Sequence, residues 1–524
     1  MIQIGNVKAP LDFTESWLVQ ETARRLGIPL VAVESVRLLR QSLDARRRND
    51  IHYVMTLGAV VADETAVLAQ CNNPHIRPAI SVTPRQLPAW TGEQDPIVIG
   101  TGPAGLFAAL TLARAGARPL VLERGDPVDA RRARVHEFWV GGALDPESNV
   151  QFGEGGAGTF SDGKLTTGTR NPRIAAVLQE LHDCGAPQDI LYAAKPHIGT
   201  DLLTDVVTQL RQKIEALGGR VLFRAKFMNF HMDSTGVSAV VYRQNGAETT
   251  VPTRHIVLAA GHSARDVFSL LHRRGVALAP KPFSLGVRIE HAQRDIDFAL
   301  YGKQGANLPA ASYQLATHLP NGRGVYTFCM CPGGVVVAAS SEAGGIVTNG
   351  MSYRARDGEN ANSAVLVGVT PADFGSNHPL AGIELQRGIE QRAYNLSNSY
   401  RAPSIALGDW LDIRTKGGTA TEPTYRPATE NYAPEAYLPN EICIALRLGI
   451  TALGKKMRGF DTATAILTGP ESRSSSPVRV LRDEAGCSLT TPGLYPVGEG
   501  AGYAGGIVSS AVDGMKIAEG FLQR

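Results

Sequence analysis

Apolar positions along this chain fall into short runs that end at glycine, and the runs alternate with longer amphipathic stretches. Residues 96–125 read PIVIGTGPAGLFAALTLARAGARPLVLERG, in which an apolar run leads through a glycine-rich turn into an alanine-rich stretch and then a second apolar run. Buried parallel strands joined by helices give this pattern. The segment therefore predicts a strand, a helix and a second strand over residues 118–122.

The first 88 residues follow a different order. Their patterning predicts strands over 2–7, 31–43, 51–61 and 76–82, with helices over 15–26 and 63–70. The order β-α-β-β-α-β is that of a ferredoxin-like unit. Its hairpin tip, DARRRND at 44–50, contains three consecutive arginines. An RNA-binding domain of this fold would carry aromatic residues on its central strands for base stacking, and only Tyr53 is available here. We expect a solvated turn there, and a polar linker over 83–96.

The glycine-rich turn has the chemistry of a dinucleotide site. Gly100 permits the tight turn, Gly102 lets the backbone approach a pyrophosphate, and Gly105 allows close packing of helix on strand. The pyrophosphate then lies at the helix N-terminus, and Glu123 ends the second strand where it can accept hydrogen bonds from ribose hydroxyls. The segment predicts nucleotide binding.

Three further segments favour FAD over NAD. Residues 491–520 contain Gly498-Glu499-Gly500 and then Gly505-Gly506 before a helix, which resembles the closing motif of FAD enzymes of the glutathione reductase type. In that motif an acid, here Glu499, contacts the ribityl hydroxyls, and the helix N-terminus points at the flavin pyrimidine. Residues 254–266 (RHIVLAAGHSARD) resemble the middle strand of the same fold, and 151–165 (QFGEGGAGTFSDGKL) resemble its glycine-rich loop beside the flavin.

The expected FAD contacts are turn residues, helix N-termini and a few polar side chains of these four segments. We expect FAD to bind non-covalently, because no His or Cys lies in a recognised flavin-linking motif. The residues are Gly100, Gly102, Pro103, Ala104, Gly105, Glu123, Arg124, Gly156, Gly158, Thr159, Ser161, Asp162, Gly163, Ala260, Gly261, Gly498, Glu499, Gly505, Gly506 and Ile507.

The segment between the middle strand and the closing motif alternates short strands, such as 334–339 and 364–369, with a long helix over 381–397. We therefore predict an α/β protein with a Rossmann-like FAD-binding domain split between residues 95–280 and 460–524. An inserted α+β substrate domain takes 281–459, and the ferredoxin-like domain takes 1–88 as an accessory unit docked on the FAD domain.

Four residues are candidates for the chemistry. Lys164 closes the glycine-rich loop and would place a positive charge near the flavin, unless it is a surface lysine. Arg473 lies shortly before the closing motif, where a guanidinium would hold an anionic substrate or stabilise charge on the flavin. Cys329 and Cys331 alternate along a predicted strand, so both thiols should face one side and line the pocket. On a straight strand their sulfurs are too far apart for an unstrained disulfide.

The string GVRIEH, residues 286–291, offers a same-face pair, Arg288 and Glu290. It is interpreted as an ion pair rather than a catalytic dyad, and His291 on the other face as an ordinary hydrogen-bonded histidine.

Composition fits a large enzyme and excludes some classes of function. The 524 residues carry a formal net charge of +3, which gives no indication of a nucleic acid or membrane partner. No signal peptide or membrane-spanning apolar run is evident, so we expect a cytoplasmic protein. The six cysteines include no CxxC, and no metal site is expected.

Over nearly its whole length the chain resembles a bacterial family described as uncharacterised FAD-dependent dehydrogenases. Beside the glycine-rich loop, the resemblance is carried by FSLGVRIEH (283–291), TFCMCPGGVV (327–336), NGMSYRARDGENANSA (349–364) and GPESRSSSPVRVLRD (469–483). The resemblance does not supply the reaction. From the FAD motifs we expect an FAD-dependent dehydrogenase or reductase that transfers a hydride between flavin N5 and a small organic substrate, with NAD(P)H as a possible external donor. The alternatives are a single-component flavin monooxygenase and, less favoured, an RNA-modifying flavoprotein. Substrate and oligomeric state are not indicated.

Overall fold

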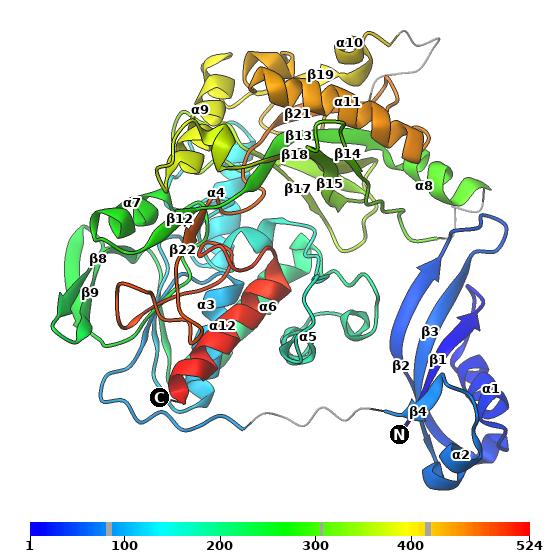
Figure 1. Ribbon diagram of the computed structural model, residues 1–524. Helices are drawn as coiled ribbons and strands as arrows, with labels where there is room; N and C mark the ends of the chain where they lie inside the picture. Colours follow the sequence, from blue (N-terminus) through cyan, green and yellow to red (C-terminus); the bar gives the residue numbers. More distant parts are fainter. Residues whose placement is uncertain (80–85, 304–307, 414–420, 524) are drawn as a thin grey trace.

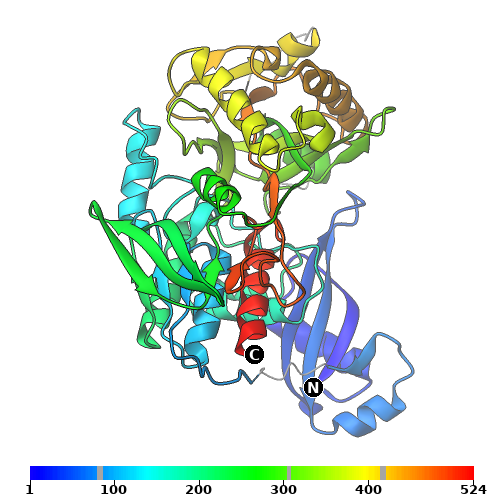
Figure 2. The same cartoon turned by 60° about the vertical axis from the view of Figure 1, so that its left-hand side comes forward.

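The computed structural model describes residues 1–79, 86–303, 308–413 and 421–523. Figures 1 and 2 show two large bodies stacked on each other and a smaller N-terminal body at their side. Among the described residues, no helix has both the length and the apolar character needed to cross a membrane.

The lower body is built on a five-stranded parallel sheet of order β23-β11-β5-β6-β7. Its strands are short and apolar, with IVI at β5 and IVL at β11, and both of these are fully buried. Close contacts pack the helices on this sheet and on each other. A Cβ on Gly105 would lie 1.9 Å from the Gly100 carbonyl oxygen, and one on Gly514 would lie 2.1 Å from that of Ala104, which joins α12 to α3. The elements are β5 (Ile97–Ile99), α3 (Pro103–Arg114), β6 (Leu120–Leu122), α4 (Val128–Trp139), α5 (Arg173–Asp183), α6 (Thr200–Ala216), β7 (Arg220–Leu222), β11 (Ile256–Leu258), α7 (Arg265–Arg273), β23 (Leu494–Pro496) and α12 (Ile507–Leu522).

Two small antiparallel sheets extend this body. One is the three-stranded sheet β10-β9-β8, inserted before β11, and the other is the pair β12-β22 beneath the upper body. Their strands are β8 (Lys226–Asp233), β9 (Gly236–Gln244), β10 (Ala247–Pro252), β12 (Leu278–Pro280) and β22 (Val478–Val480).

The upper body is the inserted domain, centred on a seven-stranded sheet of order β14-β15-β18-β13-β21-β19-β20. β21 lies beyond the predicted boundary at residue 460, yet it pairs with β13 and β19, so this sheet continues past that boundary. The elements are β13 (Phe283–Ala292), α8 (Gln293–Tyr301), β14 (Ala316–His318), β15 (Gly324–Cys331), β16 (Gly334–Ala338), β17 (Thr348–Ser352), β18 (Asn360–Val369), α9 (Ala381–Asn395), β19 (Ala402–Ala406), α10 (Leu407–Leu411), β20 (Thr429–Asn431), α11 (Asn440–Lys456) and β21 (Ile466–Glu471).

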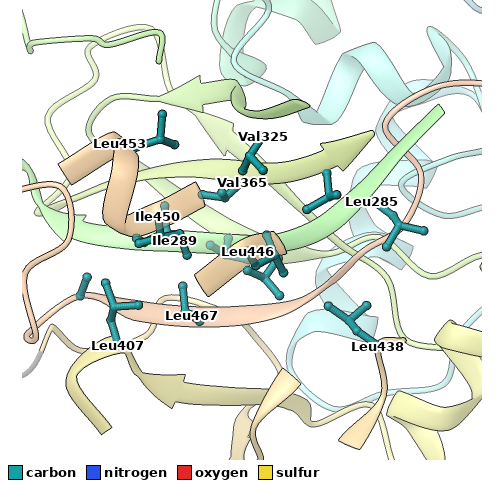
Figure 3. Close-up of a cluster of buried hydrophobic side chains, with 14 of the residues drawn as sticks. Leu285, Ile289, Val325, Val365, Leu407, Leu438, Leu446, Ile450, Leu453 and Leu467 are labelled. Carbon is teal, nitrogen blue, oxygen red and sulfur yellow. The ribbon is translucent and has the colours of Figure 1, made fainter. Parts of the chain in front are cut away.

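Helix α11 covers one face of that sheet. Leu446, Ile450 and Leu453 recur at the helical spacing and lie with Ile289 and Val365 of the central strands in one buried cluster (Figure 3). Each of these five side chains is fully buried. This core fixes β13, β15 and β21, which carry the side chains that face the lower body.

The N-terminal body has the element order expected from the sequence. Its antiparallel sheet runs β2-β3-β1-β4, with β1 (Ile2–Ala9), α1 (Glu15–Leu26), β2 (Val33–Asp44), β3 (His52–Val61), α2 (Glu64–Gln70) and β4 (Ile76–Pro78). Residues 80–82 of the last predicted strand and 83–85 of the predicted linker lie outside the described residues.

The β2–β3 hairpin connects this body to both of the others (Figures 1 and 2). Gln41 exchanges backbone hydrogen bonds with Tyr192 and Ala194 of the lower body, each 2.8 Å long. At the arginine-rich tip, Arg48 donates to the carbonyl of Ala299 in α8, and Ile51 belongs to the core cluster of the inserted domain. The tip therefore contacts the inserted domain through Arg48 and Ile51, while residues 46–50, including the three arginines, are exposed as expected of a solvated turn.

Candidate functional site

A cavity of about 520 Å³ lies between the carboxyl ends of the parallel strands and the inserted domain. It runs from Glu123 and Phe227 on the lower body to Phe328 and Cys329 of β15 on the upper one. Ligands of open α/β sheets bind at this edge, outside the carboxyl ends of the strands.

Two helix N-termini open into the cavity. Gly102 caps α3 and Gly506 caps α12. Because glycine has no side chain, neither cap residue covers the N-terminus of its helix. A Cβ on Gly102 would meet only Gly156 Cα, at 3.9 Å, so the backbone borders open space there. Unsatisfied N–H groups and the positive end of the helix dipole bind anions. The two ends of the cavity therefore fit the pyrophosphate and the flavin pyrimidine of FAD.

Glu123 lines the cavity with its carboxylate already engaged by the protein. One oxygen accepts from the Thr101 N–H and hydroxyl at 2.9 and 2.6 Å, and the other accepts from the N–H groups of Gly125 and Gly153 at 2.9 and 3.0 Å. These bonds join the glycine-rich turn to the loop after α4. Its contact with a ribose stays a prediction.

The glycine-rich loop brings a buried ion-pair cluster to the cavity wall. Arg356 forms a bidentate pair with Asp162 at 2.9 and 2.5 Å, and Lys164 Nζ lies 3.0 Å from the same carboxylate. Lys164 also donates to the carbonyl of Met330 in β15. Although burial opposes it, Lys164 and Arg356 hold the pKa of Asp162 below its usual range. Lys164 is thus a contact between the loop and the inserted domain, with a side chain 31% exposed.

At the opposite wall, Glu499 faces the cavity beside His262. Burial raises the pKa of Glu499 to about 7, and its carboxylate lies 3.8 Å from His262 Nε2. Burial also lowers the pKa of His262 to about 3, helped by the charge of Arg473, and its Nδ1 has no hydrogen-bond partner in the described part of the chain. A buried polar atom without a partner at a cavity wall is an available contact for a ligand.

Arg473 also lines the cavity, but its guanidinium is committed to Glu390. The pair is bidentate, at 3.0 and 2.8 Å, and both side chains are almost fully buried. Arg265 forms a second bidentate pair with the same carboxylate. Glu390 lies between the two guanidinium groups, so the cluster of Glu390, Arg265 and Arg473 joins α9 to the wall of the cavity. A catalytic role for Arg473 stays a prediction.

The strand that carries Cys329 and Cys331 is not straight. Cys329 has a φ of 44° and the pairing of β15 with β18 shifts register between Phe328 and Cys331. Cys329 reaches the cavity, whereas Cys331 is fully buried and is not among its lining residues. The expectation that both thiols line the pocket was wrong for Cys331, because the bulge breaks the alternation of the strand.

The expected pair of Arg288 with Glu290 is also corrected. Arg288 is fully buried and forms a bidentate pair with Glu471 of β21, both bonds being 3.0 Å. Glu290 instead accepts from Thr424 and Asn360. Arg288 pairs with Glu471 because β21 lies beside β13 in the sheet. The spacing of residues along β13 alone does not reveal this partner. His291 is hydrogen-bonded to the Phe460 carbonyl at 2.8 Å.

Most residues expected at the site surround one cavity. Those that do not line it are Gly100, Gly105, Thr159, Gly498 and Cys331. Of these, Gly100 and Gly105 shape the turn, and the Thr159 hydroxyl donates to the Glu154 carbonyl at 3.3 Å.

Among the lining side chains that sequence reasoning missed are those of Lys195, His262 and Arg356. His262 directly follows the expected contact Gly261, so its position was an available signal. Arg356 lies in the string 349–364 that carries the family resemblance, so it too was an available signal. Lys195 lies in a loop without a motif, and only tertiary contacts bring it to the cavity.

Comparison with known proteins identifies the segments of this fold. Residues 94–294 match the family described as pyridine nucleotide-disulphide oxidoreductase, residues 282–474 match "FAD-dependent protein, C-terminal domain-like", and residues 1–60 match a domain of unknown function. An uncharacterised protein of Clostridium beijerinckii is 43% identical over 531 residues, covering 100% of this chain and 99% of that one.

Solved structures show weaker likeness. A flavoprotein/dehydrogenase from Cytophaga hutchinsonii is 13% identical, with 82% of this chain and 78% of that one covered and a TM-score of 0.35. A flavin-dependent brominase is 11% identical, with 82% and 79% covered and a TM-score of 0.36. The sequence matches, taken with the cavity and its two helix N-termini, show that the chain belongs to a family of FAD-dependent oxidoreductases and that FAD is its cofactor.

Proposed function

We propose that this protein is a dehydrogenase or reductase that transfers a hydride between FAD and a small organic substrate. The observation that carries the proposal is a cavity that joins the glycine-rich segments to β15 of the inserted domain. When bound, FAD supplies the two-electron chemistry, while the protein binds the substrate and orients it.

Each wall of the cavity has a distinct part in this scheme. The N-terminus of α3 and the bare backbone at Gly102 hold the pyrophosphate, and the N-terminus of α12 faces the flavin pyrimidine. Glu499 contacts the ribityl chain, and burial raises its pKa to about 7. The inserted domain closes the remaining side and excludes water from the reacting atoms.

The part of the cavity wall next to the glycine-rich loop carries three cations, Lys164, Lys195 and Arg356, and one carboxylate, Asp162. Lys164 and Arg356 share the one carboxylate of Asp162. Lys195 is exposed at the cavity wall and its ammonium lies 3.4 Å from the Ser312 hydroxyl, with no carboxylate within salt-bridge distance among the described residues. A substrate with an anionic group, such as a small carboxylic acid, fits this field.

Anaerobic reduction of the purified FAD protein tests the proposal. A panel of 2-hydroxy and 2-amino carboxylic acids, and separately NADH and NADPH, is mixed with it while flavin absorbance is followed. Bleaching by a member of either group is the expected result. Bleaching by neither, or NADPH consumption that requires oxygen and yields a hydroxylated product, would overturn it in favour of a monooxygenase or another activity.

A second experiment tests whether Lys195 binds the anionic group of the substrate. Lys195→Met is expected to weaken the apparent affinity for the reacting acid at least tenfold while FAD occupancy is unchanged, and Lys455→Met, at an exposed position of α11, should leave both unchanged.

A further inference from the structure

Cys329 adopts a backbone conformation that a cysteine in a strand rarely takes. Its φ of 44° lies in the left-handed region, in the middle of a β-strand of the inserted domain. Non-glycine residues held there store conformational strain, and such residues cluster at functional sites. The bulge lies at the cavity, because Phe328, Cys329 and Met330 all line it.

The bulge changes how far apart the two thiols are. On a regular strand, residues two apart have Cα atoms separated by about 6.6 Å, near the upper limit for a disulfide. Here Cys331 Sγ lies 3.3 Å from the Cys329 carbonyl oxygen, so its side chain turns back toward the preceding cysteine. The separation that argued against a disulfide on a straight strand therefore does not apply.

Cations surround this pair. Arg288 Nη1 donates to the Cys329 carbonyl at 3.0 Å, and Lys164 donates to the next carbonyl, that of Met330. The carboxylates that face the thiols are Asp162, Glu471 and Glu499. Asp162 is paired with Lys164 and Glu471 with Arg288, whereas burial raises the pKa of Glu499 to about 7.

The surroundings shift the pKa values of the two thiols in opposite directions. The neighbouring Cys331 side chain, together with the charges of Lys164 and Arg288, holds the pKa of Cys329 well below its usual range despite burial. The neighbouring Cys329 side chain and burial raise the pKa of Cys331. A cysteine of lowered pKa that reaches a cavity, with a second cysteine of raised pKa behind it, is the arrangement of a reactive and a resolving cysteine.

We propose that Cys329 and Cys331 are a redox-active dithiol that exchanges two electrons with FAD. In the forward direction the Cys329 thiolate and the Cys331 thiol form one Sγ–Sγ bond, and two electrons and the Cys331 proton pass to oxidised FAD. The reverse step breaks that bond and restores thiolate and thiol. The inference goes beyond hydride transfer to an organic substrate and depends only on FAD binding.

Mass spectrometry tests the bond without any assay of activity. The protein, with and without FAD, is oxidised with diamide, blocked with N-ethylmaleimide and digested. A peptide with an internal Cys329–Cys331 disulfide is expected in the wild type and should be absent in Cys331→Ser. Cys71→Ser, remote in the N-terminal body, is the matched control and should retain the disulfide. Free thiols at both positions in the oxidised wild type would overturn the proposal.

Anaerobic titration of the FAD protein with dithionite tests the exchange. The oxidised wild type should consume two electrons for FAD and two for the pair, and Cys331→Ser only two in all. A disulfide that is present yet stays intact when FAD is fully reduced would also overturn the proposal. Because the mass-spectrometric arm needs neither substrate nor FAD, its outcome is independent of whether the proposed hydride transfer is correct.

Discussion

At the scale of single residues, Gly102 presents backbone instead of a side chain where α3 begins. Its Cβ position points into the cavity, with only Gly156 Cα nearby. We therefore expect Gly102→Val to fold but to purify without flavin colour, because the side chain occupies the path of the pyrophosphate. Gly388→Ala, in α9 and away from the cavity, should keep full flavin absorbance. Yellow Gly102→Val with full FAD occupancy would contradict the assignment.

The raised pKa of Glu499 predicts that the free energy of unfolding depends on pH. Burial raises its pKa from 4.5 to about 7, so the folded chain binds this proton more tightly than the unfolded chain. Its contribution to stability is complete below about pH 4.5 and is lost as pH rises toward 7, in total on the order of 3 kcal/mol. In FAD-free protein, Glu499→Gln should remove most of this loss.

The measurement is urea unfolding of both proteins between pH 4.5 and 8. The advantage of Glu499→Gln over wild type should grow with pH, whereas the exposed Glu484→Gln should follow the wild-type profile. Parallel profiles for wild type and Glu499→Gln would refute the raised pKa.

At the scale of elements, the Arg288–Glu471 pair joins β13 to β21 inside the inserted domain. Arg288 is fully buried and Glu471 is 5% exposed. Replacing Glu471 by Ala leaves a buried guanidinium without its carboxylate, and we expect a loss of about 3–5 kcal/mol. Glu248→Ala breaks an exposed pair between β9 and β10 and should cost less than about 1 kcal/mol. Comparable losses by chemical denaturation would show that Arg288 is stabilised by other groups.

Features formed by residues that are adjacent in the chain could be predicted from the sequence, whereas contacts between distant strands could not. The turn from β5 into α3 was predictable because its glycines and the helix lie next to each other in the chain. The partner of Arg288 was not, because Glu471 comes 183 residues later and reaches it only when β21 enters the sheet. Lys195 reaches the cavity wall in the same way, through tertiary contacts that no local pattern encodes.

At the scale of the whole molecule, the β2–β3 hairpin fastens the N-terminal body to the other two. Ile51 at its tip is 9% exposed and shares a core cluster with the inserted domain. We expect Ile51→Ala to lower the free energy of unfolding by about 2–3 kcal/mol while FAD stays bound. Leu30→Ala, in the same body but 52% exposed, should change it by less than about 0.5 kcal/mol. Equal effects in a urea titration would mean that the tip is not buried in solution.

The docked hairpin also has a consequence for synthesis on the ribosome. The tip leaves the ribosome before α8, which carries its acceptor Ala299 and follows only after some 250 further residues. At about 5–20 residues per second, the apolar side chain of Ile51 waits for its partners for tens of seconds. During that interval the arginines at 46–48 keep the nascent tip charged and solvated, so the residues that flank the docking contact also protect it from premature association.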